Sequence, residues 1–149
     1  MKRFQFRLES VLLYRRQLEE LALVDFQKAL SNERDAEDKL IRMRDSLNDL
    51  CRAGMNGEDG SVRMQRDEFK RQLFTLIEMQ TRLLTELKGV TKEKRERYLE
   101  SRKETRILER LRDKAWLEYQ KSVDKVEQQE MDDLFLMKRK EMEIMERVT

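Results

Sequence analysis

Few side chains in this sequence could carry out chemistry, and none of them stands in a catalytic pattern. The 149 residues include no histidine and one cysteine, Cys51. Histidine is the usual general base near neutral pH and the commonest metal ligand, so both roles lack their ordinary residue. No serine stands in a G-x-S-x-G context, and no G-x-x-x-x-G-K-[ST] phosphate loop is present. These observations favour a protein that is not an enzyme and that holds no cofactor.

Acidic clusters are the remaining candidates for a metal site or for acid–base catalysis. Glu58 and Asp59 are adjacent, but the alternating acidic ligands and the terminal glutamate of an EF-hand loop are missing. A solvated turn explains this pair better than a cation site. Asp132 and Asp133 likewise lack a partner arrangement for acid–base work. We therefore expect no metal site and no catalytic residue.

The composition indicates long helices with a single bend. Charged residues make up 43% of the chain and hydrophobic residues 38%. There is no proline, and three of the four glycines (Gly54, Gly57 and Gly60) fall within seven residues. Proline and glycine are the residues that most often interrupt a helix. The sequence therefore predicts an all-α fold in which two long helices form an antiparallel coiled-coil hairpin, the second helix being longer and overhanging the first.

A heptad pattern supports this fold and gives its boundaries. We expect one elongated domain over residues 1–149, with a first helix over about 7–52, a loop over about 53–61 and a second helix over about 62–146. Alternating steps of four and three visit thirteen positions in the first helix, ten of them apolar: Leu8, Leu12, Arg15, Glu19, Ala22, Phe26, Ala29, Glu33, Ala36, Leu40, Met43, Leu47 and Leu50. A second frame runs through Phe69, Leu73, Leu76, Gln80, Leu83, Leu87 and Val90, and apolar positions resume at Leu108, Leu111 and Ala115.

A short loop between long helices favours antiparallel neighbours, and a hinge near residue 57 pairs residues whose numbers sum to about 115. This register places Leu40 near Leu76, Phe26 near Leu87 and Val90, and Leu8 near Ile107 and Leu108. The first helix is then exhausted near residue 111, which leaves about 35 residues of the second helix without an intramolecular partner. This overhang contains Trp116, Tyr119 and Phe135. We expect such an amphipathic, aromatic helix end to bind another molecule.

The charge distribution argues against nucleic acid and against a membrane span. The net charge is only +2, whereas strong binding to phosphate backbones needs clustered, uncompensated cations. The basic stretch Lys92–Arg106 is interleaved with glutamates, so a solvated helix with pairs such as Glu93 with Arg97 explains it better. No run approaches the roughly 20 apolar residues that a membrane-spanning helix requires. A single cysteine fits a reducing compartment, and we expect a cytoplasmic protein.

Two segments resemble the flagellar FliJ proteins. The N-terminal block F-Q-F-R-L-E-S-V-L at residues 4–12, followed by Arg15 and Arg16, resembles the F-x-F-x-L-x-x-V-L opening of that family. The segment L-E-R-L-R-D-K at 108–114 resembles the family's E-[KR]-L-[RK]-x-[KR] segment, and the acidic stretch at 130–133 resembles its acidic tail. The resemblance covers nearly the whole chain, although Asp132-Asp133 stands where Asp-Glu is commoner.

This resemblance implies a component of the bacterial flagellar type III export apparatus. FliJ proteins are antiparallel coiled-coil hairpins similar to the stalk subunit of rotary ATPases. They insert into the ring of the export ATPase FliI, contact the export-gate protein FlhA and escort export chaperones. The chain would then be a monomeric hairpin that works at the inner face of the cell membrane through its partners, without inserting into the bilayer.

Partner-binding residues are expected in two places. At the end that would face the ATPase they are Phe4, Phe6, Leu8, Leu12, Trp116, Tyr119 and Phe135. Around the middle and the bend, residues that mix seam and partner roles are Leu40, Met43, Phe69 and Leu76. Packing within the seam is the ordinary alternative for each of them.

Two other functions remain open on the sequence. One is a generic coiled-coil scaffold or holdase chaperone, which sedimentation would reveal as an obligate homodimer. The other is a nucleic-acid-binding helix, whose affinity would depend steeply on salt.

Overall fold

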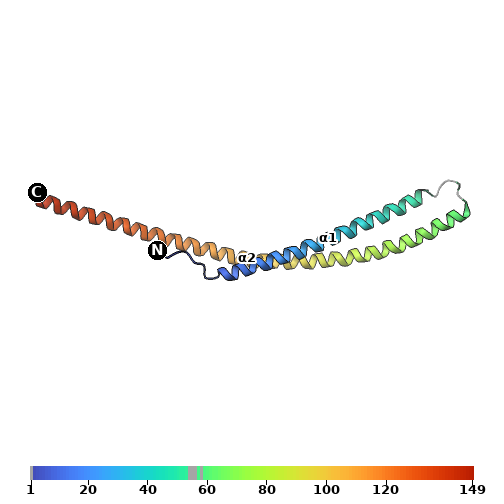
Figure 1. The fold of residues 1–149 in the computed structure, drawn as a ribbon, viewed down its shortest axis with the longest axis horizontal. Helices are drawn as coiled ribbons and strands as arrows, with labels where there is room; N and C mark the ends of the chain where they lie inside the picture. Colours follow the sequence, from blue (N-terminus) through green and yellow to red (C-terminus); the bar gives the residue numbers. More distant parts are fainter. Residues whose placement is uncertain (1, 54–56, 58) are drawn as a thin grey trace. The chain divides into compact units, whose positions relative to one another are not determined.

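The fold consists of two long helices. The computed structural model describes residues 2–53, 57 and 59–149. Helix α1 spans Glu9–Ala53 and helix α2 spans Gly60–Val148, and the described residues include no strand. The predicted all-α hairpin with a longer second helix is confirmed (Figure 1). Contacts divide the chain into two units, Gln17–Arg102 and Met1–Arg16 with Lys103–Thr149. We call these the hairpin unit and the terminal unit and describe each by itself.

The bend between the helices contains a glycine in a left-handed backbone conformation, as the glycine cluster in the sequence suggested. Gly57 has a φ of 53°, in the left-handed region that glycine adopts without a steric penalty. Helix α2 begins directly after Asp59, whose backbone carbonyl accepts a hydrogen bond from the Arg63 N–H at 3.1 Å. Gly54 and Glu58 lie outside the described residues. The positive φ therefore assigns Gly57 a turn position.

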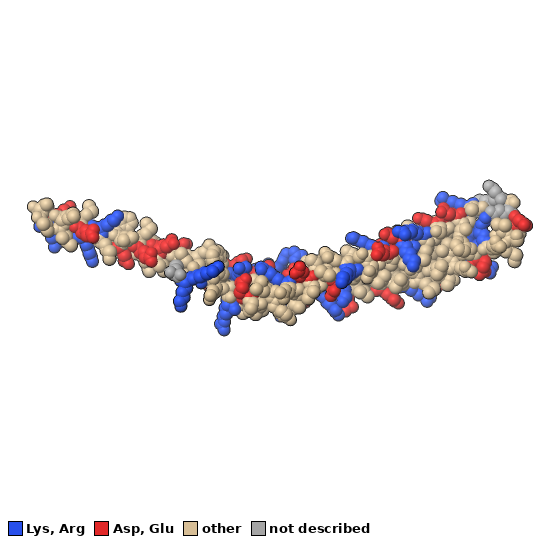
Figure 2. Space-filling view, viewed as in Figure 1, with Lys and Arg blue, Asp and Glu red and all other residues tan. Residues whose placement is uncertain are grey.

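The seam of α1 follows the predicted heptad frame. All thirteen predicted positions are buried or partly buried, and acidic and basic side chains are interspersed over the solvent side of the helices (Figure 2). In the hairpin unit, Ala36, Leu40 and Leu84 form the core, and Ile77 and Leu87 pack against it. Apolar burial on this narrow stripe holds the two helices together, since the remaining faces are mostly charged.

Two polar residues of α2 are buried in the same seam and bind the backbone of α1. The Gln80 side-chain amide donates a hydrogen bond to the Ala36 carbonyl at 3.0 Å. The Thr91 hydroxyl lies 3.2 Å from the Ala29 carbonyl and 2.9 Å from the Leu87 carbonyl, so its single proton is shared between them. Alanine at 29 and 36 leaves room for these side chains to reach the α1 backbone. Buried polar groups need such partners, so the two bonds specify the register.

Helix α2 turns a different face towards α1 than the sequence predicted. Leu73, Gln80 and Leu87 occupy the seam as expected. The intervening seam positions are Ile77, Leu84 and Thr91, each one residue later than predicted; the predicted Phe69, Leu76, Leu83 and Val90 are between 43% and 53% exposed. The ambiguity arose because α2 carries adjacent apolar pairs at 76–77 and 83–84. The buried stripe is the one that contains Thr91, whose hydroxyl lies within hydrogen-bond distance of the Ala29 carbonyl of α1.

The predicted register was wrong at Phe26. Its ring stacks on Tyr98, with centroids 6.2 Å apart and planes inclined by 4°, instead of lying near Leu87 and Val90. Side chains on a helix lean towards its N-terminus. In an antiparallel pair, the side chains of the two helices therefore lean in opposite directions along the common axis. Large side chains therefore meet although their backbones are offset along the helices.

In the terminal unit the first turns of α1 pack on α2 through Leu12, three ion pairs and a hydrogen bond from the buried Thr105 hydroxyl to the Arg15 carbonyl at 3.4 Å. Leu12 is completely buried. Arg15 pairs with Glu104; Arg16 pairs with Glu109 at 3.3 Å and Glu9 with Arg112 at 3.2 Å. Ile107, predicted as a neighbour of Leu8, is instead 58% exposed. A surface hollow brings Leu8 together with Leu111 and Ala115.

The residues before α1 change where the overhang begins. Residues 2–6 are not helical and run along α2 (Figure 1), where Phe4 contacts Trp116 and Tyr119. The prediction that α2 loses its partner near residue 111 was therefore wrong for both aromatic residues. An extended chain advances about 3.3 Å per residue against about 1.5 Å in a helix. A short N-terminal segment consequently reaches further along α2 than a continued helix would.

Beyond this contact α2 continues as an exposed helix. Val123 and Val126 are partly buried, and every residue from 127 to 149 is exposed. Within the described residues, neither helix contains a stretch apolar enough to cross a membrane. We call residues 127–148 the C-terminal extension.

Candidate partner-binding surfaces

Three aromatic rings in the terminal unit fasten the N-terminal segment to α2. The Phe4 ring meets Trp116 edge to face, with centroids 4.9 Å apart and planes at 80°, and lies 5.4 Å from Tyr119. Trp116 and Tyr119 are 5.6 Å apart. Aromatic pairs of this geometry contribute about 0.5–1.5 kcal/mol beyond the area they bury. We call these three residues the aromatic cluster.

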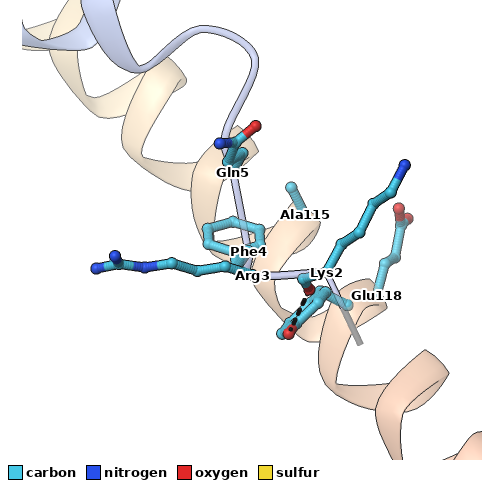
Figure 3. A pocket seen from close by; sticks show the side chains of 7 residues that line it. Lys2, Arg3, Phe4, Gln5, Ala115 and Glu118 are labelled. Carbon is cyan, nitrogen blue, oxygen red and sulfur yellow. Dashed lines mark hydrogen bonds between the residues drawn. The ribbon is translucent and has the colours of Figure 1, made fainter.

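A hydrogen bond from α2 to the backbone of the N-terminal segment completes this attachment. The Tyr119 hydroxyl donates to the Lys2 carbonyl at 3.0 Å. Figure 3 shows the Phe4 ring against α2 near Ala115, whereas the side chains of Lys2 and Arg3 extend away from the helix. The segment thus buries its aromatic ring and presents its cations to solvent.

The hairpin unit carries an exposed apolar stripe on α2. Its residues recur every seven positions beside the seam, and each is between 43% and 53% exposed: Val62, Phe69, Leu76, Leu83 and Val90. Successive members lie two turns apart, so they form one continuous row along the helix. We call this row the outer stripe. Exposed apolar rows of this kind often mark protein-binding surfaces.

The C-terminal extension carries a second exposed apolar surface. Met131, Leu134 and Phe135 are 57%, 58% and 66% exposed, and together with Lys138 they line a surface hollow. Their spacing of three and four places them on one face of the helix. Methionine and phenylalanine side chains here can adapt to a binding partner without disturbing a core.

Comparison with known families identifies the chain. The model of the flagellar FliJ protein matches residues 4–141. The chain belongs to the FliJ family. The match includes the aromatic cluster, the outer stripe and most of the C-terminal extension. None of the curated proteins and none of the solved structures that were compared matches it. FliJ is a non-catalytic component of flagellar export, and the chain accordingly has a role related to that process.

The structure brings only some of the predicted FliJ partner residues to the surface. Leu12 and Leu40 are 0% and 4% exposed and belong to the core. The predicted residues that are partly buried are Phe4, Phe6, Leu8, Met43 and Tyr119, and those that are exposed are Phe69, Leu76, Trp116 and Phe135. Phe135 stands apart from the aromatic cluster, further along α2. The second group offers the larger contact area to a partner.

Sequence reasoning missed part of the exposed apolar surface of this FliJ chain. It did not single out Val62, Leu83 or Val90 for binding, although the seven-residue spacing was already a signal. It also overlooked Leu21 and Val24, which line a hollow on α1 with Gln17 and Glu20. Both sets stand outside the α1–α2 seam.

No metal centre accompanies these surfaces in the part of the chain that the structure describes. There, no three His, Cys, Asp or Glu side chains gather closely enough to hold an ion. Cys51 is exposed near the end of α1. The acidic pair at 58–59 is described only at Asp59, whose side chain accepts a hydrogen bond from Ser61 at 3.4 Å.

Proposed function

We propose that this FliJ-family chain couples the export ATPase FliI to the export-gate protein FlhA and escorts export chaperones, using helix surfaces alone. The supporting observation is that each unit presents an apolar surface of its own. The hairpin unit has the outer stripe. The terminal unit has the aromatic cluster and the C-terminal extension. Through these partners the chain would act in the cytoplasm at the inner face of the cell membrane.

The C-terminal extension is the proposed ATPase-binding element. All its residues are exposed, so a partner can cover Leu134 and Phe135 without unpacking the core. Burial of each such side chain contributes about 1.5–3 kcal/mol. A helix end of this kind suits insertion into a ring, as the resemblance to rotary-ATPase stalks suggests.

The outer stripe is the proposed surface for the export gate or for a chaperone. Phe69 and Leu76 lie at its centre and are 53% and 48% exposed. A partner helix could pack along this row beside the existing seam, because the residues have coiled-coil spacing. Binding there would leave Leu40 and Leu84 undisturbed in the core.

A pull-down with purified FliI and the cytoplasmic domain of FlhA tests this division. One variant ends after Val126, and a second carries Phe69→Ser with Leu76→Ser. We expect the truncated chain to lose FliI and keep FlhA, and the stripe variant to do the reverse. A cut after Leu111 would be a poorer choice, because it also removes Trp116 and Tyr119.

The control is the behaviour of each variant alone. Sedimentation should show monomers for the intact chain and for both variants, with unchanged helix content by circular dichroism after allowance for length. Equal recovery of both partners by all chains would refute the assignment of surfaces. An obligate homodimer would favour the scaffold function instead.

A further inference from the structure

Helix α2 carries a second coiled-coil spacing within the terminal unit, on the face opposite to its seam. The row is Lys103, Ile107, Arg110, Lys114, Leu117 and Lys121, at alternating steps of four and three. All six side chains are exposed, and Arg106, also exposed, flanks the row. Partly buried Ala115 and Tyr119 face the other way, towards the N-terminal residues, and Lys114 of the row borders a hollow beside those residues. We call the exposed row the basic stripe; at 1.5 Å per residue it is about 27 Å long.

The cations of the basic stripe form no close ion pair with the described residues. By contrast, Arg82 and Arg97, which lie earlier on α2, each pair with the glutamate four residues before them, at 2.9 and 2.7 Å. Two glutamates of the same segment, Glu104 and Glu109, bind arginines of α1 instead; the third, Glu118, is exposed and lies four residues after Lys114. Within α2 the stripe therefore forms a gap in the ion pairing, which resumes with Arg139 and Glu143 at 3.7 Å.

The spacing of these cations has a cost for the isolated helix. Arg106, Arg110 and Lys114 follow each other at intervals of four residues, where like charges repel and destabilise a helix. At other places on α2 a glutamate stands at that distance from an arginine and pairs with it. A partner that brings negative charge would remove the repulsion.

The apolar members of the row identify the kind of partner. Ile107 and Leu117 are 58% and 55% exposed and interrupt the cations at heptad spacing. A phosphate backbone would engage the cations and gain nothing from two aliphatic side chains. A helix with carboxylates and apolar residues would satisfy both. We propose that the basic stripe binds an acidic amphipathic helix of another protein, whichever proteins bind the outer stripe and the C-terminal extension.

Matched variants separate charge from packing. Arg110→Glu with Lys114→Glu reverses two cations four residues apart on the stripe. Lys88→Glu with Lys92→Glu makes the same change, at the same spacing, on exposed residues of α2 in the hairpin unit. Ile107→Gln with Leu117→Gln removes the apolar contacts and leaves the charge unchanged. Circular dichroism and the emission of the single tryptophan, Trp116, check that each full-length variant is folded.

The probe is a series of fluorescein-labelled, glutamate-rich helical peptides about four heptads long. Each carries two leucines with the separation of Ile107 and Leu117, and the pair is moved one residue at a time through the heptad. We expect saturable, salt-sensitive anisotropy binding for at least one register. The Arg110/Lys114 reversal should weaken it about tenfold, and the Ile107/Leu117 change should weaken it by a similar factor of about ten. The Lys88/Lys92 control should bind like the unaltered chain.

Four results would overturn the proposal. They are the absence of saturable binding in every register, equal weakening by the Lys88/Lys92 control, no effect of the glutamine substitutions, and tighter binding of a short duplex DNA or of phosphatidylglycerol vesicles than of every peptide. The last two would show that the stripe acts only as a row of positive charge.

Discussion

The Tyr119 hydroxyl donates a hydrogen bond to the backbone carbonyl of Lys2 at 3.0 Å, across 117 residues of sequence. The same tyrosine ring contacts Phe4. One residue of α2 therefore fixes both the backbone and a side chain of the N-terminal segment. This attachment is small, because it lies near the surface and involves few residues, and its parts can be removed one at a time.

Tyr119→Phe should loosen the N-terminal segment while keeping the ring contacts. The lost hydrogen bond is worth about 1 kcal/mol or less, since the group is exposed. We expect faster amide exchange at residues 2–8, measured by hydrogen exchange with mass spectrometry. Tyr14→Phe is the control, because Tyr14 is 57% exposed. Exchange at residues 2–8 that is no faster than in the control would refute the role of the hydroxyl.

Phe4→Ala should release the segment further and expose Trp116. Trp116 is the only tryptophan, so its emission reports this contact without labelling. We expect a shift of the emission to longer wavelength and stronger quenching by acrylamide, with unchanged helix content. Phe74→Ala serves for comparison, since Phe74 is 58% exposed in the hairpin unit. An unchanged spectrum for Phe4→Ala would mean that the ring does not cover Trp116 in solution.

Adjacent leucines test which face of α2 is buried. Leu84 is 7% exposed and Leu83 is 45% exposed. Leu84→Ala should lower the free energy of unfolding by about 2–3 kcal/mol, because it leaves a cavity in the core. Leu83→Ala should lower it by less than about 1 kcal/mol. Urea denaturation followed by circular dichroism measures the free energy of unfolding of both variants. Equal losses would contradict the burial of Leu84 and favour the heptad frame through Leu83 that the sequence predicted.

Ala36→Leu tests the close contact between the helices. Ala36 is 7% exposed, and its carbonyl accepts the Gln80 hydrogen bond. A larger side chain should force the helices apart and destabilise the fold by about 1–3 kcal/mol. Ala53→Leu provides the matched substitution at an exposed position at the end of α1. A thermal midpoint for Ala36→Leu at or above that of the control would show that the seam has room to spare.

The sequence was sufficient to predict which face of α1 is buried, but it was ambiguous about the buried face of α2. In α1 a single apolar stripe is available, and Leu12, Ala29 and Leu40 all lie where the heptad put them. In α2 apolar residues are adjacent at 76–77 and 83–84, and the more apolar of the two stripes is the exposed one, so periodicity favoured Leu83 over Leu84. The choice depends on hydrogen bonds from Gln80 and Thr91 to a helix distant in sequence, which no local pattern reveals.

The candidate surfaces were partly predictable for a similar reason. Phe4, Trp116 and Tyr119 were predicted as partner-binding residues at one end of the molecule, and the structure brings their rings into contact. Their mutual contact was not foreseen, because the predicted first helix begins at about residue 7 and nothing in the sequence shows where the residues before it run. An extended segment forms there because it brings Phe4 onto the aromatic residues of α2.

The hydrogen bonds from Gln80 and Thr91 to the alanine carbonyls also have a mechanical consequence. Leucines in an apolar seam can exchange neighbours one heptad along, so two such helices slip past each other when sheared. In the hairpin unit, any slip would strand both polar groups among apolar side chains and press larger residues against the positions of Ala29 and Ala36. A lengthwise load on one helix would therefore be carried over to the other before it could be relieved by sliding.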